Sequence, residues 1–249
     1  MAGHSKWANI KRRKGAQDAK RGKIFTRVTK EIMLAAKLGG GDIDGNSRLR
    51  AAVESAKSVN LPKDKIETAI KKGTGEIGAE SIEEVTYEGY APGGVAMLIE
   101  AATDNKNRTV AEVRHILSKG GGSLGEAGCV AWMFDRRGIL RFSKESYAEE
   151  QLLEVGLEAG AEDVRDDGDS WEVRTEPEAL SEVQEAYKAA GLEYTEADVA
   201  MVPQNTVPLD KETGEKVLKV YEALDDHDDV QRVYANFDLP DDLLEELAR

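Results

Sequence analysis

The chain has 249 residues, of which 40% are hydrophobic and 33% are charged, and its formal net charge is −14. This length allows two or three domains, and the apolar share suffices for packed cores, which excludes a wholly disordered chain. The longest apolar stretch, 95–102, is far shorter than the roughly 20 residues that span a bilayer, so we expect no transmembrane helix. No apolar segment follows the basic N-terminus, which argues against a secretory signal and predicts a cytoplasmic protein.

The charge is divided unevenly along the chain. Residues 1–75 hold 18 Lys and Arg against 7 Asp and Glu, a net charge of +11, whereas the remaining residues sum to −25. A basic head on an acidic body is typical of a module that binds a polyanion, joined to a part that like charge holds away from it. The acidic body is also a possible surface for a protein partner.

The head is predicted to be helical. Apolar residues recur at spacings of three and four over 16–38, and the glycines at 39–41 stop the run, which predicts one long amphipathic helix. The lysines and arginines of this segment repeat on the opposite side of the helix. Shorter helices are predicted after Asn46 and from Pro62 to Gly73, so the head forms a three-helix domain.

Beyond the glycine-rich link 73–78 the pattern changes to short strands. Strands are predicted at 86–91, 95–102 and 129–134, with a helix at 107–119 before the third of them. From 139 to 202 the elements follow the order βαββαβ, which is that of a ferredoxin-like domain. The helix and strand after Pro208 cannot bury themselves alone, so we expect them to return to the sheet of residues 80–135.

The predicted fold class is therefore α+β and multidomain, with a three-helix domain followed by two α/β sandwich domains, the last of them inserted in the middle one. The boundaries are a basic helical nucleic-acid-binding domain at 1–78, an α+β domain at 79–136 plus 206–249, and an inserted ferredoxin-like domain at 137–205.

The candidate nucleic-acid-binding residues lie mainly in the head, where a basic arm with one aromatic residue leads into the cationic helix face. Phosphate contact and base stacking are the natural uses of such an arm. The residues are Lys6, Trp7, Lys11, Arg12, Arg13 and Lys14 in the arm, and Lys20, Lys23, Arg27 and Lys30 on the helix. One aromatic residue is few for stacking, so the alternative is that Trp7 packs on the bundle.

A second candidate cluster contains Lys106 and Arg108, at the start of a helix whose first amide groups attract anions. The alternative is that Asp104 or Asn105 caps this helix and the cluster binds nothing. The acidic run 225–229 lacks the ligand spacing of a calcium loop, and we expect it to be a solvated turn.

Two stretches match enzyme motifs, but the elements predicted on either side of them do not fit those motifs. Residues 121–125 match the nucleophile elbow around Ser123, but that turn needs a strand before it and a helix after it, the reverse of the prediction here. Residues 73–78 match a dinucleotide fingerprint, but they follow a helix and run into Glu76 and Glu80. Cys129 is the only cysteine and gives no metal-ligand pattern, so we expect no metal. Because both enzyme motifs fail, we also expect no catalytic residue and no cofactor.

Several long stretches resemble the YebC family. They read MAGHSKWANIKRRKGAQDAKRGKIFTRVTKEI, RLRAAVESAKSVNLPKDKIETAIKKGTGE, YEGYAPGGVAMLIEAATDNKNRT and VQRVYANFDLP, in this order along the chain. The resemblance implies a helical N-terminal domain with two α/β domains. It also implies a DNA-binding transcriptional regulator of the bacterial cytoplasm, although mitochondrial relatives act as translational activators and bacterial ones have been linked to the ribosome.

The resulting hypothesis is a non-enzymatic, nucleic-acid-binding regulator of gene expression, first of all a DNA-binding transcriptional regulator. The alternative is a translation factor on ribosomal RNA, which the absence of an obvious recognition-helix motif favours. A hydrolase built around Ser123 or the acidic cluster is a third hypothesis, but it lacks a credible pair of base and nucleophile.

Overall fold

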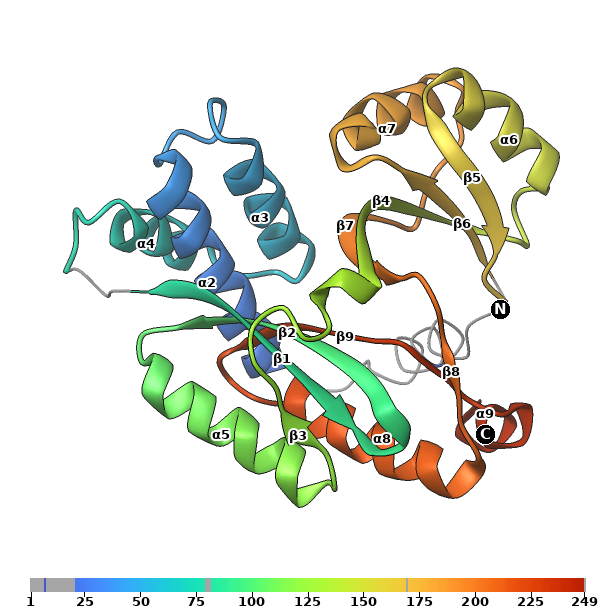
Figure 1. Ribbon diagram of the computed structural model, residues 1–249. Coiled ribbons are helices and arrows are strands. Elements are labelled where there is room, and N and C mark those ends of the chain that lie inside the picture. The colour runs from blue at the N-terminus through green and yellow to red at the C-terminus, as the bar shows by residue number, and fades with distance from the viewer. Residues whose placement is uncertain (1–6, 8–20, 79–81, 169, 249) are drawn as a thin grey trace. The chain divides into compact units, whose positions relative to one another are not determined.

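The computed structural model describes residues 7, 21–78, 82–168 and 170–248 (Figure 1). Their contacts form two compact units, of which the first contains residues 21–78, 82–130 and 215–233, and the second contains Trp7 and residues 131–168, 170–214 and 234–248. The chain therefore leaves the first unit after Val130, builds most of the second, returns to the first at Glu215–Val233 and ends in the second. Among the described helices, none combines the length and the apolar character that crossing a membrane requires.

Three helices open the first unit, as the periodicity predicts, although the predicted start at residue 16 lies outside the described residues. Ile32, Leu49 and Ile66, one from each helix, are buried in their common core. The helices are α2 Arg21–Gly39, α3 Ser47–Ser58 and α4 Lys63–Gly73.

The buried side chain of Asn46 joins the end of α2 to the start of α3. Its amide nitrogen donates to the carbonyl oxygens of Ala35 and Gly40, at 2.8 and 2.9 Å. Its amide oxygen accepts from the backbone N–H of Leu49 at 3.0 Å and so caps α3. One side chain thus satisfies backbone groups that both helix ends would otherwise leave without partners.

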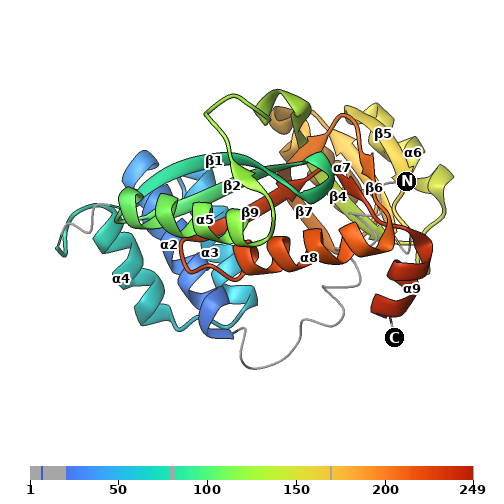
Figure 2. The same ribbon diagram turned by 60° about the horizontal axis from the view of Figure 1, so that its bottom comes forward.

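A four-stranded sheet in the order β3-β1-β2-β9 follows the bundle. Strands β1 and β2 form an antiparallel hairpin, and β9 arrives from the end of the chain, so the predicted return to this sheet is confirmed. Helices α5 and α8 lie side by side on one face of it (Figure 2). The elements are β1 Glu83–Ala91, β2 Val95–Thr103, α5 Lys106–Lys119, β3 Ser123–Leu124, α8 Lys211–Asp225 and β9 Val230–Ala235.

The bundle and this sheet share one core. Ile82, just before β1, and Ala102 of β2 are buried among the apolar side chains of α2, α3 and α4. Residues 21–78 therefore pack as part of a larger unit, although the sequence predicts a separate domain at 1–78. The three domain boundaries stay a prediction.

The second unit contains the predicted ferredoxin-like domain. Its elements follow the order βαββαβ, and its sheet has the strand order β5-β6-β4-β7 with every neighbouring pair antiparallel, which is the split βαβ arrangement. The elements are β4 Phe134–Ser143, α6 Glu149–Glu158, β5 Ala161–Asp166, β6 Ser170–Thr175, the 3₁₀ turn Pro177–Ala179, α7 Leu180–Ala189 and β7 Glu196–Pro203. The short strands β8 Val207–Pro208 and β10 Phe237–Asp238 pair in parallel, and α9 is Asp241–Ala248.

Both helices of the ferredoxin-like domain pack on the sheet through a buried aromatic pair. Phe142 of β4 and Tyr187 of α7 have ring centroids 4.6 Å apart. The Tyr187 hydroxyl donates to the Leu152 carbonyl of α6 at 2.7 Å, and burial raises the pKa of Tyr187 to about 12. This hydroxyl ties α7 to α6 inside the core.

The predicted strand at 129–134 is wrong. The buried carboxylate of Glu88 accepts the backbone N–H groups of Gly128 and Val130, at 2.6 and 2.7 Å, and holds this segment as a loop. A 3₁₀ turn, Ala131–Met133, follows, and β4 begins only at Phe134. The edge position beside β1 belongs instead to β3.

The close packing of α5 and α8 generates a prediction about stability. A Cβ atom at Gly120 would lie 2.0 Å from Cγ2 of Val220, so Gly120→Ala should lower the free energy of unfolding by about 1–3 kcal/mol. Combining it with Val220→Ala should cost less than the two single changes together, by about 1 kcal/mol in urea denaturation. Gly22→Ala is the control, because nothing lies within 4 Å of that site. Strict additivity would contradict the contact.

Candidate nucleic-acid interface

Lys23, Arg27 and Lys30 lie on one side of α2, because spacings of four and three return to the same helix face. Their side chains face the segment Asp225–Asp229, which links α8 to β9 and is called the acidic loop below. Each of the three cations is bound to this loop. The predicted cationic face of α2 is therefore paired, and the acidic run is not the solvated turn that the sequence suggests.

The two outer ion pairs are open to solvent to different degrees. Lys23 Nζ lies 3.2 Å from an oxygen of Asp226, and the two side chains are 41% and 61% exposed. Arg27 lies 3.2 Å from an oxygen of Asp225, with exposures of 25% and 23%. Ion pairs in contact with water stabilise a fold by only about 0–1 kcal/mol, so both can exchange partners at little cost.

The inner ion pair is the least exposed of the three, with the Lys30 side chain 19% exposed. Lys30 Nζ donates to Asp229 Oδ1 at 2.6 Å and to the carbonyl oxygen of Asp228 at 2.9 Å. The Asp229 side chain is 5% exposed. The pairs therefore become less exposed along α2, from Lys23 to Lys30.

Asp229 is also bound from α5. Its second oxygen accepts from the Arg108 guanidinium and from the Thr109 hydroxyl, both at 2.7 Å, and lies 3.3 Å from the Thr103 hydroxyl. Its backbone carbonyl accepts from the N–H of Ala102 at 2.8 Å, where β9 begins beside β2. One carboxylate thus connects α2, α5, β2 and β9.

These donors set the protonation of Asp229. Burial opposes the charged form, but the hydrogen bonds from Lys30, Arg108 and Thr109 outweigh it and hold the pKa of the Asp229 carboxyl well below its usual range. The hydrogen bond from Arg108 to Asp229, together with a second one from Arg108 to the Asp104 carboxylate at 2.9 Å, raises the pKa of the Arg108 guanidinium. Asp229 is therefore a carboxylate, fully charged, throughout the physiological pH range.

A cavity of about 840 Å³ opens beside these pairs. Lys23 and Lys30 of α2, Arg108 and Glu112 of α5, and the loop residues 226–229 contribute to its wall. Carboxylates outnumber cations in this lining, so a free anion entering the cavity would meet negative charge as well as positive. The cavity alone is not a phosphate site.

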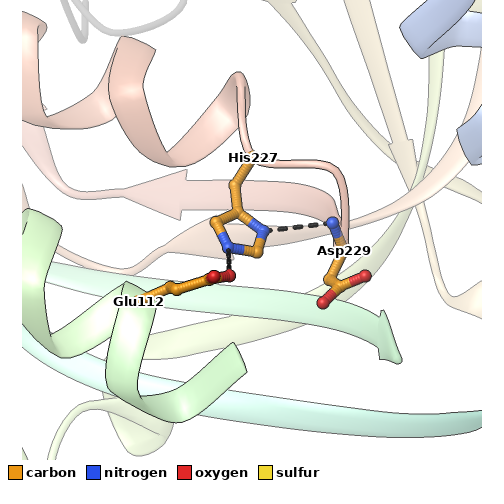
Figure 3. Close-up of side chains that lie close together, drawn as sticks. All are labelled: Glu112, His227 and Asp229. Carbon is orange, nitrogen blue, oxygen red and sulfur yellow. Dashed lines mark hydrogen bonds and ion pairs between the residues drawn. The ribbon is translucent and has the colours of Figure 1, made fainter. Parts of the chain in front are cut away.

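Glu112, His227 and Asp229 bring ligand-type atoms within 4.8 Å of one another, but their hydrogen bonds do not fit a metal ion (Figure 3). The Asp229 N–H donates to His227 Nδ1 at 3.0 Å, so the ring proton is on Nε2, which donates to Glu112 at 2.7 Å. A metal on Nε2 would force a proton onto Nδ1, where it would face another donor. The carboxylate of Asp229 is already bound by Lys30 and Arg108.

The remaining predicted residues are placed as follows. Lys106 forms an ion pair with Glu83, and the Asn105 side chain caps α5 by accepting from the Arg108 N–H at 3.1 Å, as the capping alternative supposes. Trp7 is 3% exposed and packs edge-on against Phe237, so in this position it offers no ring face to a base. Six predicted residues lie outside the described part of the chain: Lys6, Lys11, Arg12, Arg13, Lys14 and Lys20.

Comparison with known proteins agrees with this architecture. The profile of the TACO1/YebC protein N-terminal domain matches residues 5–76, and that of the TACO1/YebC second and third domain matches residues 82–237. The chain belongs to the TACO1/YebC family. The chain is also similar to the crystal structure of the conserved hypothetical protein Aq1575 from Aquifex aeolicus, with a TM-score of 0.82 and 48% identity, covering 90% of this chain and 92% of that one.

Several TACO1/YebC relatives are named probable transcriptional regulatory proteins. The protein from Maridesulfovibrio salexigens is 62% identical over 99% of both chains. That from Solidesulfovibrio magneticus is 59% identical over 98% of this chain and 99% of its own. That from Syntrophus aciditrophicus is 57% identical over the whole of both chains. These names support a regulatory role for the chain.

Local sequence patterns do not predict that the acidic loop is the partner of α2. Lys23 and Asp226 are 203 residues apart, and no local spacing connects them. One signal was available, because the run 225–229 is strongly acidic and directly precedes the predicted strand that returns to the sheet. Such a return brings the run into the same unit as the basic head.

Asp229→Asn should destabilise this TACO1/YebC chain by roughly 3 kcal/mol, because it leaves Lys30 without its buried counterion. Since folding lowers the pKa of Asp229, its contribution is present at neutral pH and is lost as the pH falls below about 4. Urea denaturation from neutral pH to about pH 3 should show the two proteins converging. Asp228→Asn, at an exposed loop position, is the control and should change stability by less than about 0.5 kcal/mol. An equal loss in both variants would contradict the role of the inner pair.

Proposed function

We propose that the chain is a nucleic-acid-binding regulator of gene expression, acting on duplex DNA without catalysis. The observation that carries the proposal is the charge division, with +11 in residues 1–75 and −25 in the rest. Phosphate neutralisation supplies most of the affinity of such proteins, and it needs Lys and Arg without any special pKa. The regulatory names of the relatives favour DNA as the ligand.

The basic arm is the main phosphate-binding segment in this proposal. The cations of α2, Lys23, Arg27 and Lys30, already have carboxylate partners, so they contribute only after exchange. The arm residues with the highest density of charge are Lys11, Arg12, Arg13 and Lys14. The acidic remainder of the chain orients the head by repulsion from the nucleic acid and is available to protein partners in the cytoplasm.

A translation factor on structured RNA is the second candidate. The observation that favours it is the position of α2, whose cationic row faces the acidic loop and is not presented as a recognition helix for a major groove. Structured RNA is read mainly by shape and backbone contacts, for which such a helix is not needed. Duplex DNA and an RNA hairpin of equal length, titrated at the same salt concentration, distinguish the two. Tighter binding of the hairpin would replace DNA by RNA in the proposal.

The arm makes a measurable contribution to salt dependence. With about five phosphates engaged, the slope of log K against log salt should be about −4 to −5 on duplex DNA. Replacing Lys11, Arg12, Arg13 and Lys14 by Ala should make the slope shallower by about 0.9 for each lost phosphate contact. The control replaces Arg165 and Lys188, cations of the acidic part that already pair with carboxylates. An unchanged slope in the arm variant would exclude the arm as the phosphate-binding segment.

The absence of catalysis is tested at Ser123. This exposed residue lies on β3, an edge strand paired with β1 through Tyr90, and α5 precedes it. That order does not form a nucleophile elbow. Ser123→Ala should therefore leave reporter output or ribosome occupancy in cells unchanged, whereas Lys11→Glu with Lys14→Glu should abolish it. Loss of function in the serine variant alone would favour chemistry over nucleic-acid binding.

A further inference from the structure

The acidic loop occupies the cationic surface that a polyanion would use. Asp225 and Asp226 bind Arg27 and Lys23 through charge-assisted contacts, the same kind that a phosphodiester oxygen makes with these groups. Asp228 is exposed next to them. A nucleic acid approaching this side of α2 therefore meets carboxylates before it meets cations.

The position of Asp225 in its own helix is unfavourable. Asp225 is the last residue of α8, and the last turn of α8 contains no basic residue. Carboxylates at a helix C-terminus oppose the helix dipole. Local helix stability thus does not account for acidic residues here, whereas their contacts with α2 do.

We propose that the acidic loop is an intramolecular competitor of duplex DNA: Asp225 and Asp226 occupy Arg27 and Lys23 until a phosphodiester backbone displaces them, while Asp229 stays bound to Lys30 and Arg108. This inference rests on the proposed function. The surface made by Lys23 and Arg27 is then a second phosphate-binding site, closed in the free protein and open in the complex.

The gradient of burial separates the part that moves from the part that stays. The outer pairs are within reach of water, so displaced carboxylates regain hydration. Lys23 Nζ also donates to the backbone carbonyl of Asp226 at 2.8 Å, so release moves the backbone at the end of α8 as well as the two side chains. Asp229 is held by two cations and a threonine hydroxyl, and its backbone is bonded to β2. The acidic loop can therefore lose its contacts with α2 at Asp225 and Asp226 while Asp229 keeps its own contacts.

The test compares full-length variants in DNA titrations over a series of salt concentrations. Asp225→Asn with Asp226→Asn removes the competing charges, and binding should tighten by roughly tenfold near 0.1 M salt, with a slope steeper by up to about 2. The matched control is Glu215→Gln with Glu222→Gln, which removes the same charge from exposed positions of α8. This control measures how much DNA affinity rises when two negative charges that repel DNA are removed elsewhere on α8. We expect that rise to be less than threefold.

A second pair of variants assigns the effect to the contacts. In a background of Lys23→Gln with Arg27→Gln, the loop substitutions should no longer tighten binding beyond the control. Equal gains with and without these cations would overturn the competition. Equal DNA affinities of the loop variant and its control would also overturn the competition. If all the proteins still bound DNA in that case, the proposed function would remain intact. Failure of every variant to bind DNA would overturn both proposals together.

Amide hydrogen exchange provides an independent readout on the wild-type protein. Saturating duplex DNA should speed exchange at residues 225–228 by at least several-fold, while the Ala102 amide, bonded to the Asp229 carbonyl, keeps its protection. Protection that increases over the whole acidic loop would overturn the proposed displacement. A response to an RNA hairpin and none to duplex DNA would overturn the choice of partner.

Discussion

The first unit depends on one buried carboxylate. The Asp229 carboxylate accepts hydrogen bonds from a lysine of α2 and from an arginine and a threonine of α5, and Asp229 directly precedes the first residue of β9. Isolated buried charges are costly, so these partners must all be in place together. The helical bundle, the helix that covers the sheet and the strand that returns from the far end of the chain are thereby fixed to one another at a single point.

This arrangement changes how the charge of the head should be understood. The excess of Lys and Arg in residues 1–75 looks like a surface reserved for an external polyanion, yet part of it is neutralised by residues of the acidic remainder. The same cations serve folding at the buried end of α2 and are exchangeable at its exposed end. In the proposed function, a structural and a binding role are thus divided along one helix by depth of burial.

Local patterns were sufficient for most of the elements. Helix α4 could be predicted because Ile66 and Ala69 follow helical spacing and Gly73 closes it, and the β1–β2 hairpin because 92–94 is a turn signal. The segment 129–134 could not, because Glu88, forty residues earlier, decides its conformation. The site shows the same limit: spacing identifies the cations of α2, but their partners depend on a chain reversal that no short window contains.

The distance along the chain between these partners has a consequence for synthesis. Lys23 and Asp226 are separated by 203 residues, and the ferredoxin-like domain lies between them. At roughly 5–20 residues per second, α2 leaves the ribosome about 10–40 s before the acidic loop does. During this interval the nascent head is strongly cationic, with no internal counterions for Lys23, Arg27 or Lys30, beside a particle made largely of RNA. Completion of the C-terminal segment is therefore the step that supplies Lys23, Arg27 and Lys30 with these carboxylate partners, so pairing of the α2 cations is timed by the end of translation.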